Sequence, residues 1–201
     1  MTSNNALIPD PDKEDVLASN PSQWPLLAVG LRMCGWGDDK IKFYLLGNPI
    51  AWWGGTASLA VFALTLAYYI VRRQRRIHDI SPGQWEQFQY VGKVLMGGWF
   101  LHYLPFCIMG RVTYLHHYFP ALYFTLLLFS FNLDHFLSRP SVSARTRMVV
   151  WGLAFTAVIG TFFFFWDVSY GIRGPVSPQM KNRQWRAAWN IIDDHKPNTF
   201  I

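Results

Sequence analysis

The sequence predicts an all-α, polytopic membrane protein with four transmembrane helices. Of its 201 residues, 51% are hydrophobic and only 15% are charged, whereas a soluble domain carries about 25% charged residues. The apolar residues gather in four uncharged stretches with Trp and Tyr near their ends, as is typical of helices that cross a membrane. This much apolar surface excludes a disordered chain, and the presence of only two cysteines excludes a disulfide-rich scaffold.

The predicted spans cover about residues 47–71, 93–110, 118–136 and 148–167. A helix that crosses a hydrocarbon core of about 30 Å needs about 20 apolar residues, and about 17 is the lower limit. The first and last uncharged stretches have 29 and 19 residues and meet this requirement. The second and third have 17 and 16 residues, so a buried helix of a soluble protein remains an alternative for these two.

Basic residues predict the orientation of the spans. The loop after the first span and the loop after the third together carry eight basic residues in 36 positions, while the opposite side carries ten in 84. By the positive-inside rule the two loops lie in the cytosol, and both termini lie on the opposite side of the membrane. The arginine-rich run at 72–76 is interpreted as a flank of the span that contacts anionic lipid, and this position argues against nucleic-acid binding.

The segments outside the spans differ in character. The expected divisions are a flexible polar N-terminus without a signal-peptide pattern (1–20), the membrane region (21–192) and a tail (193–201). Residues 22–46 mix tryptophans and leucines with charges, which predicts an amphipathic segment in the membrane interface before the first span. Trp185, Trp189 and Ile192 recur at helical spacing and predict a second interfacial segment.

Asn48 and Pro49 predict the start of the first span. Proline suits the first turn of a helix, where its missing N–H would have no partner in any case. Trp52 and Trp53 follow one turn later, at the depth of an aromatic belt.

Polar side chains in or next to a span are costly and are therefore candidates for function. They are concentrated around the short turn that joins the second and third spans. Arginine offers a planar, permanently charged group to phosphate, His and Tyr donate hydrogen bonds, and each contact counts for more in the lower dielectric near the membrane. The turn is therefore predicted to hold the phosphate of an anionic headgroup, with an interfacial belt of His and Tyr as the alternative. The candidate pocket residues are His102, Tyr103, Arg111, Tyr114, His116 and His117.

No catalytic residue is assigned in this chain. Paired carboxylates do not accompany the turn, because Asp134 lies at the cytosolic end of the third span and Asp167 at the outer boundary of the fourth. The sequence has no metal-binding or phosphate-loop motif, so neither a metal site nor a cofactor is predicted. His102 and His116, with thirteen residues between them, resemble the haem ligands of b-type cytochromes, but the turn and Pro105 interrupt the helix that would carry both. The lack of an acid inside the spans disfavours a transporter.

Three stretches resemble the C-terminal membrane portion of the dolichyl-phosphate-mannose–protein O-mannosyltransferases. They are IKFYLLGNPIAWW (41–53), GWFLHYLPFCIMGRVTYLHHYFPALYF (98–124) and WRAAWNI (185–191). The second stretch is long and unusual, and the resemblance extends from about Pro21 to about Ile192. The form GRVTYLHHYFPALYF is similar to the fungal subfamily whose members pair as heterodimers.

The resemblance implies an enzyme of the endoplasmic reticulum with a GT-C fold. Such an enzyme moves mannose from dolichyl phosphate mannose to Ser or Thr hydroxyls of secretory proteins, with the donor lipid as a substrate and no cofactor. It implies that Arg111, His116 and His117, with Tyr103 and Tyr114 beside them, help to shape a lumenal pocket for the phosphate of the carrier. Stabilising the phosphate that leaves in this reaction is an electrostatic task.

Members of that family are longer, with an N-terminal membrane half, a lumenal MIR domain and an acidic motif that supplies the catalytic base. These parts are not among the 201 residues, and residues 1–20 differ from the family, so we expect the chain alone to lack transferase activity. The alternative is a non-catalytic subunit or scaffold that binds a full-length transferase. Glycines that would permit the close helix packing of such a scaffold are Gly54, Gly55, Gly97 and Gly98.

Overall fold

A computed structural model describes residues 17–37 and 40–191 of the chain. Most of the predicted polar N-terminus, the tail 193–201 and Ile192 lie outside the described residues. The predicted all-α class is confirmed. The long helices of this part are α1 (Pro49–Gln74), α2 (Pro82–Ile108), α3 (Phe119–Leu137) and α4 (Ala144–Phe164). The short elements are η2 (Pro21–Gln23), β1 (Leu31–Arg32), β2 (Tyr44–Leu45), η3 (Leu115–Tyr118), α5 (Trp166–Tyr170), α6 (Val176–Met180) and η4 (Ala187–Trp189).

Helix α1 begins where the sequence predicts. The side chain of Asn48 accepts a hydrogen bond from the N–H of Ala51 at 3.1 Å, and Pro49 occupies the first turn. The Asn48 Nδ2 also donates to the carbonyl oxygen of Val158 at 2.9 Å. One side chain therefore caps α1 and joins it to α4.

Helix α2 begins at Pro82, well before the predicted residue 93. The hydroxyl of Ser81 accepts a hydrogen bond from the N–H of Gln84 at 3.3 Å, and the side chain of Gln84 accepts one from the N–H of Ser81 at 3.0 Å. This capping box starts a helix whose first turns are polar and include Glu86. A prediction based on the absence of charge misses such turns, since the start of a helix outside the hydrocarbon need not be apolar.

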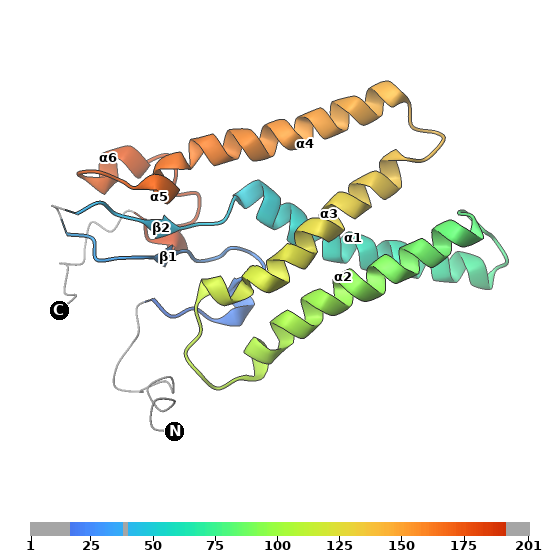
Figure 1. Ribbon diagram of the computed structural model, residues 1–201, viewed down its shortest axis with the longest axis horizontal. Helices are drawn as coiled ribbons and strands as arrows, with labels where there is room; N and C mark the ends of the chain where they lie inside the picture. Colours follow the sequence, from blue (N-terminus) through green and yellow to red (C-terminus); the bar gives the residue numbers. More distant parts are fainter. Residues whose placement is uncertain (1–16, 38–39, 192–201) are drawn as a thin grey trace.

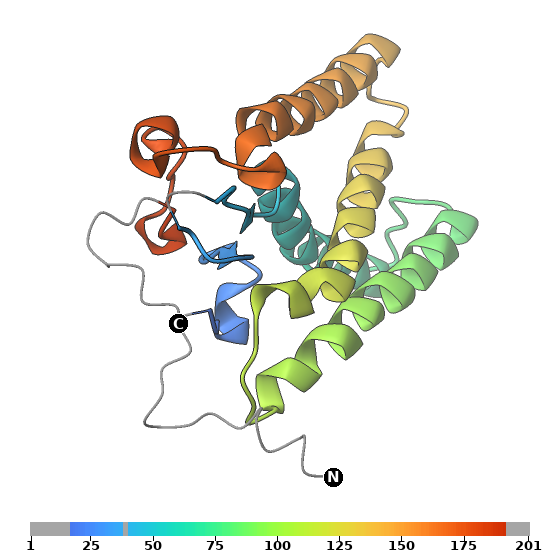
Figure 2. The same ribbon diagram turned by 60° about the vertical axis from the view of Figure 1, so that its left-hand side comes forward.

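Helix α3 packs against both α1 and α2, and Figures 1 and 2 show it between α4 and α2. Two glycines allow the helices to approach closely. A Cβ on Gly55 would lie 2.7 Å from Thr125 Oγ1, and a Cβ on Gly98 would lie 2.4 Å from the ring of Phe124. A Cβ on Gly54 would lie 3.1 Å from the ring of Phe129, so three of the four glycines named for partner binding pack inside the chain, whereas Gly97 faces open space.

Three helices, α1, α2 and α4, are long and apolar enough to cross a membrane within the described residues. Helix α3 is not among them, because it combines 19 residues with Asp134 and His135 near its end. It nevertheless coincides with the third predicted span and runs between the same two ends of the bundle as its neighbours (Figure 1). The count of four crossings stays a prediction.

The two basic loops, 75–81 and 138–143, lie at one end of the bundle (at the right in Figure 1). The turn between α2 and α3 lies at the other end, together with β1, β2, α5 and α6. This arrangement matches the predicted division of the loops between two sides.

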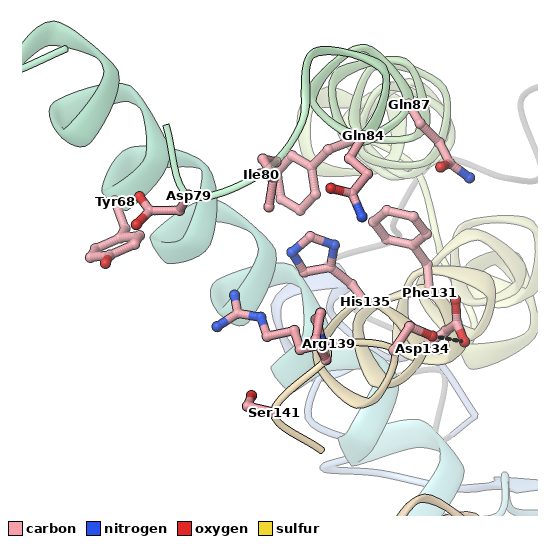
Figure 3. Close-up of a pocket in the computed structure, with 13 residues that line it drawn as sticks. Tyr68, Asp79, Ile80, Gln84, Gln87, Phe131, Asp134, His135, Arg139 and Ser141 are labelled. Atoms are coloured by element: carbon pink, nitrogen blue, oxygen red, sulfur yellow. Dashed lines mark hydrogen bonds between the residues drawn. The ribbon is translucent and has the colours of Figure 1, made fainter. Parts of the chain in front are cut away.

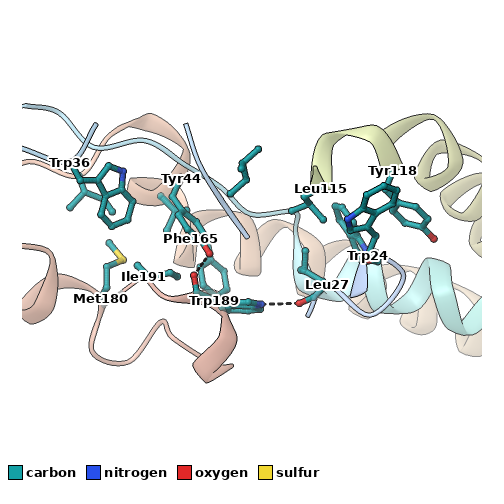
Figure 4. Packing of buried hydrophobic residues seen from close by; sticks show 14 of the residues in the cluster. Trp24, Leu27, Trp36, Tyr44, Leu115, Tyr118, Phe165, Met180, Trp189 and Ile191 are labelled. Atoms are coloured by element: carbon teal, nitrogen blue, oxygen red, sulfur yellow. Dashed lines mark hydrogen bonds between the residues drawn. The ribbon is translucent and has the colours of Figure 1, made fainter. Parts of the chain in front are cut away.

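The place of residues 22–46 in a membrane interface stays a prediction, but residues 17–37 and 40–46 do not form a separate segment. They fold with residues 165–191 into a cap over the helix ends, in which Leu31 of β1 pairs with Leu45 of β2 and the backbone of Lys42 pairs with that of Ile172. Apolar side chains from both segments, such as Leu27, Tyr44 and Ile191, are buried in one cluster (Figure 4), while others such as Leu26, Met33 and Tyr170 stay exposed. Packing the two segments against each other removes apolar surface of both from water, which is favourable.

Tryptophans hold the cap together. Trp52 Nε1 donates to the carbonyl oxygen of Trp24 at 2.7 Å, and Trp189 Nε1 donates to that of Leu27 at 2.8 Å (Figure 4). The hydroxyl of Tyr44 donates to the carbonyl oxygen of Trp189, and burial raises the pKa of Tyr44, so the donor keeps its proton. The buried indole of Trp24 also finds an acceptor, the hydroxyl of Ser19 at 2.8 Å.

The second predicted interfacial segment is wrong as a helix, because residues 187–189 form only a 3-10 turn. Trp189 is 1% exposed and belongs to the cap, while Trp185 is 44% exposed. Asp167 lies in α5, just beyond the end of α4, and accepts a hydrogen bond from Arg183 Nη1 at 2.5 Å.

Candidate functional site

The turn between α2 and α3 is tied to the cap. Thr113 Oγ1 donates to the carbonyl oxygen of Ser19 at 2.7 Å, and the N–H of Ser19 donates to the carbonyl oxygen of Thr113 at 2.8 Å. Leu115 and Tyr118 of η3 are fully buried in the cluster under the cap. These contacts fix the backbone from which the polar side chains of the turn project.

Three of the six predicted pocket residues form one stack of rings. The His116 and His117 rings lie 4.4 Å apart, and the Tyr114 ring lies 5.7 Å from that of His116. His117 Nδ1 lies 3.0 Å from both the N–H and the carbonyl oxygen of Tyr114. The His117 ring is thereby anchored to the turn, and it also faces Phe106 of α2 at 5.1 Å.

Tyr103 reaches the cap from α2. Its hydroxyl donates to the carbonyl oxygen of Pro21 at 3.1 Å, and its ring lies 5.6 Å from that of Tyr118. His102, the preceding residue, belongs to a different environment. Its Nδ1 lies 2.8 Å from the carbonyl oxygen of Gly98, and its ring lies 5.1 Å from that of Phe124 on α3.

The six residues are therefore only partly brought together. Tyr114, His116 and His117 share a stack, Tyr103 contacts the cap next to them, and His102 faces α3. His102 and His116, the pair considered for haem, belong to separate groups of rings. Within the described part of the chain, no three His, Cys, Asp or Glu side chains gather into a possible metal site.

Electrostatics keep His117 neutral. Burial lowers the pKa of His117 below its ordinary value of 6.5, and the nearby charges of His116 and Arg111 lower this pKa further, against an opposing hydrogen bond to the Tyr114 backbone. Arg111 itself is exposed at the start of the turn. The site combines one accessible cation with a neutral imidazole, which can donate a hydrogen bond.

Acidification is expected to destabilise the fold through His117. Because the pKa of His117 is lowered in the folded state, the unfolded chain binds more protons below about pH 6.5, and stability falls as the pH decreases through that value. The midpoint of thermal unfolding in detergent micelles, measured at about pH 7.5 and about pH 5.5, should decrease less in His117→Asn than in the wild type. The exposed His78 provides the control, since His78→Asn should keep the full decrease; an equal decrease in His117→Asn would contradict the assignment.

Sequence reasoning missed the residues that support this site from a distance. Trp24 belongs to the segment 22–46, which was expected to be amphipathic and interfacial, yet its ring is buried and lies 6.3 Å from that of His117. Trp99 Nε1 donates to the hydroxyl of Tyr118 at 3.1 Å. The apolar run that begins with Trp24 and continues through Leu26 and Leu27, directly after the polar N-terminus, is a sequence signal for a buried anchor.

A further cavity of about 430 Å³ opens at the capped end and was not predicted. Its walls include Trp53 of α1 together with Trp185 and Arg186. The two indole rings lie 6.2 Å apart, and the Arg186 guanidinium lies 5.8 Å from the centre of the Trp53 ring. The predicted aromatic belt at Trp53 is thus part of a groove.

The apolar helices, the basic loops at one end and the aromatic cap at the other define a helical membrane protein that keeps its polar site beside the cap. More narrowly, the chain belongs to the protein-O-mannosyltransferase family. The family model described as the C-terminal four TMM region of protein-O-mannosyltransferase matches residues 1–189. The match includes residues 1–20, which the sequence analysis had separated from the family region.

Named relatives agree with this assignment. The chain is 41% identical to dolichyl-phosphate-mannose–protein mannosyltransferase 2 of Candida albicans, over 96% of this chain and 26% of the relative. It is 38% identical to mannosyltransferase 6 of Saccharomyces cerevisiae, over 94% of this chain and 25% of the relative. Human protein O-mannosyl-transferase 1 is 30% identical over 90% of this chain and 25% of the relative. The chain thus spans about a quarter of the length of these relatives.

A solved structure resembles the fold as well. It is that of the Saccharomyces cerevisiae protein O-mannosyltransferase Pmt1–Pmt2 complex bound to the sugar donor, with a TM-score of 0.74 and 27% identity. The match covers 92% of this chain and 24% of that one. It confirms the expected fold class, a helical membrane part of a GT-C glycosyltransferase.

Proposed function

We propose that this chain is the C-terminal membrane part of a dolichyl-phosphate-mannose–protein mannosyltransferase. In the complete enzyme it would help to move mannose from dolichyl phosphate mannose to Ser or Thr of secretory proteins at the endoplasmic reticulum membrane. The observation that carries the proposal is the match of residues 1–189 to the family's C-terminal membrane region, at about a quarter of the relatives' length. The proposal includes four crossings, lumenal termini, no catalytic residue in this chain and no cofactor besides the donor lipid.

The turn beside the cap is the proposed contact with the phosphate of the donor. Arg111 is exposed there, and the neutral His117 stands beside it with its Nδ1 engaged by the turn. An arginine fork and neutral donors suit the charge that develops on a departing phosphate. Next to these two residues lie His116, Tyr114 and Tyr103, and His102 lies nearest to α3.

A family partner is part of the proposal. The solved relative is a complex of two family members, Pmt1 and Pmt2, which supports a heterodimer for the enzyme to which this chain belongs. The competing function is that of a non-catalytic subunit that binds a full-length transferase through its apolar helices. It is favoured by the exposed face of α4, in which no residue is buried.

A chimera tests the proposal. The C-terminal quarter of the Candida albicans relative is replaced by this chain, and mannose transfer from dolichyl phosphate mannose to a Ser/Thr peptide is measured in membranes. We expect transfer by the chimera and none by this chain alone or by the relative without its C-terminal quarter. A chimera that assembles with its partner yet stays at the level of the truncated relative contradicts the proposal. Co-purification of the separate chain with an intact transferase, without restored activity, supports the non-catalytic subunit.

A further inference from the structure

The end of the bundle that carries the basic loops holds a second cavity, distinct from the site beside the cap. Its volume is about 500 Å³, and it lies between the loop before α2, the start of α2 and the end of α3 (Figure 3). Apolar side chains such as Phe88 and Phe131 form part of its wall. Its polar lining includes Gln84, Gln87, His135, Ser138, Arg139 and Ser141.

Arg139 is held in place at this cavity. Its Nη2 donates to the hydroxyl of Tyr69 at 2.8 Å, and that hydroxyl lies 2.7 Å from His135 Nε2. Tyr69 is 1% exposed, so the group that orients the arginine is itself fixed. The guanidinium also lies 5.1 Å from the ring centre of Phe136. An arginine has five N–H donors, and these contacts leave several of them for a ligand.

The acidic residues at the cavity are already engaged. Asp79 accepts hydrogen bonds from Arg72 Nε at 3.0 Å and Nη2 at 2.7 Å, and this contact lowers the pKa of the Asp79 carboxyl. Asp134 Oδ1 accepts a hydrogen bond from Ser138 Oγ at 2.9 Å. Neither carboxylate therefore offsets the charge of Arg139 to the extent that a direct ion pair would.

The surroundings of the cavity are strongly basic. Four arginines lie at the end of α1 and directly after it, within residues 72–76. Two more, Arg145 and Arg147, lie in the first turn of α4. A pocket inside such a positive field attracts anions. Its place at the ends of apolar helices, with aromatic rings in its wall, puts it at the level of lipid headgroups.

We propose that this cavity binds the headgroup of an anionic glycerophospholipid, with phosphatidylinositol as the preferred form. Arg139 contacts the phosphate, because a planar fork matches phosphate oxygens. The amides of Gln84 and Gln87 and the hydroxyl of Ser141 suit the hydroxyls of an inositol ring (Figure 3). The apolar wall accommodates the start of the acyl chains. A choline headgroup would instead bring a cation towards Arg139.

Native mass spectrometry of the 201-residue chain in micelles tests this site. The chain is titrated with phosphatidylinositol, phosphatidylserine or phosphatidylcholine, and the bound lipid is counted. We expect phosphatidylinositol to bind most tightly and phosphatidylcholine least. Arg139→Gln should weaken phosphatidylinositol binding about tenfold, the effect of losing one charged hydrogen-bond donor.

The matched control is Arg145→Gln, which removes one charge from the neighbouring start of α4 at an exposed position outside the cavity lining. It should leave binding almost unchanged, while Tyr69→Phe, which releases Arg139, should weaken binding severalfold. Circular dichroism confirms that each variant is folded, and Arg139→Lys provides a second variant if Arg139→Gln does not fold.

Two outcomes overturn the proposal. Equal losses in Arg139→Gln and Arg145→Gln would mean diffuse attraction to a basic surface, and equal binding of the three lipids would mean that no headgroup is recognised. Inorganic phosphate and soluble inositol phosphate distinguish the source of the anion. Full competition at the same affinity as the lipid would assign the cavity to a soluble anion instead.

Discussion

Replacing Arg111 with alanine in the chimeric transferase is expected to reduce mannose transfer about tenfold to about a hundredfold. A hydrogen bond to a charged group contributes about 1.5–3 kcal/mol, and about 1.4 kcal/mol corresponds to a factor of ten in rate. Arg111 is the exposed cation of the turn, and the charge on the carrier phosphate grows as the mannose leaves. The measurement is the initial rate of transfer from dolichyl phosphate mannose to a Ser/Thr peptide.

The control for this variant is Arg173→Ala, which removes an exposed arginine from the capped end but away from the turn. Its rate should stay close to that of the unchanged chimera. Arg111→Lys should retain part of the activity, because it keeps the charge but loses the fork. If Arg111→Ala and Arg173→Ala behave alike in well-folded protein, Arg111 does not contact the phosphate, and family membership is unaffected.

Replacing Trp52 with alanine is expected to lower the free energy of unfolding by about 3–5 kcal/mol, the usual cost of truncating a buried large aromatic side chain. Trp52 is 1% exposed, its ring lies 5.6 Å from that of Tyr118, and its Nε1 donates to the buried carbonyl oxygen of Trp24. The variant therefore leaves both a void and an unpaired acceptor. Unfolding by increasing SDS in mixed micelles, followed by circular dichroism, measures the difference.

The neighbouring Trp53 is the matched control. It is also a tryptophan of α1 and also donates to a backbone carbonyl oxygen, that of Leu26 at 2.9 Å, but it lies at the edge of an open groove. Trp53→Ala should cost much less than Trp52→Ala. Similar losses in the two variants would mean that the cap does not depend on burial of Trp52.

The sequence predicts the long helices well because each carries its own signal. Asn48–Pro49 locates the start of α1, and the apolar stretch of α3 agrees with the helix Phe119–Leu137. The start of α4 at Ala144 precedes the predicted residue 148, because Ser143 caps a first turn that contains Arg145. Charged residues indicate where a helix leaves the hydrocarbon core, whereas the capping residue indicates where the helix itself begins. These two positions need not coincide.

The cap is not predictable from local patterns. Its hydrogen bonds join residues far apart in the chain, such as Trp189 with Leu27 and Lys42 with Ile172. The intervening helices bring these segments to one end of the bundle. No periodicity within either segment predicts that the two segments pack together. The same mixture of Trp, Leu and charge is compatible with a separate interfacial segment, so the local pattern does not reveal the cap.

The structure brings the predicted site residues together where they are neighbours in the turn and separates them where they lie on a helix. Tyr114, His116 and His117 share one short 3-10 segment and its flank, so their rings meet. His102 and Tyr103 are adjacent on α2, but successive residues of a helix point about 100° apart. The His102 ring therefore packs on Phe124, whereas the Tyr103 hydroxyl donates to the carbonyl oxygen of Pro21. The presence of polar residue types in the sequence does not show this difference in direction.

The closure of the cap by both end segments has a consequence for biosynthesis. A ribosome makes residues 17–46 before any of the long helices and residues 165–191 after all of them. The carbonyl oxygen of Leu27 therefore has no Trp189 indole to accept from until residue 189 has been made. The helices can insert one after another, but this end of the bundle takes its final form only after residues 165–191 have been made.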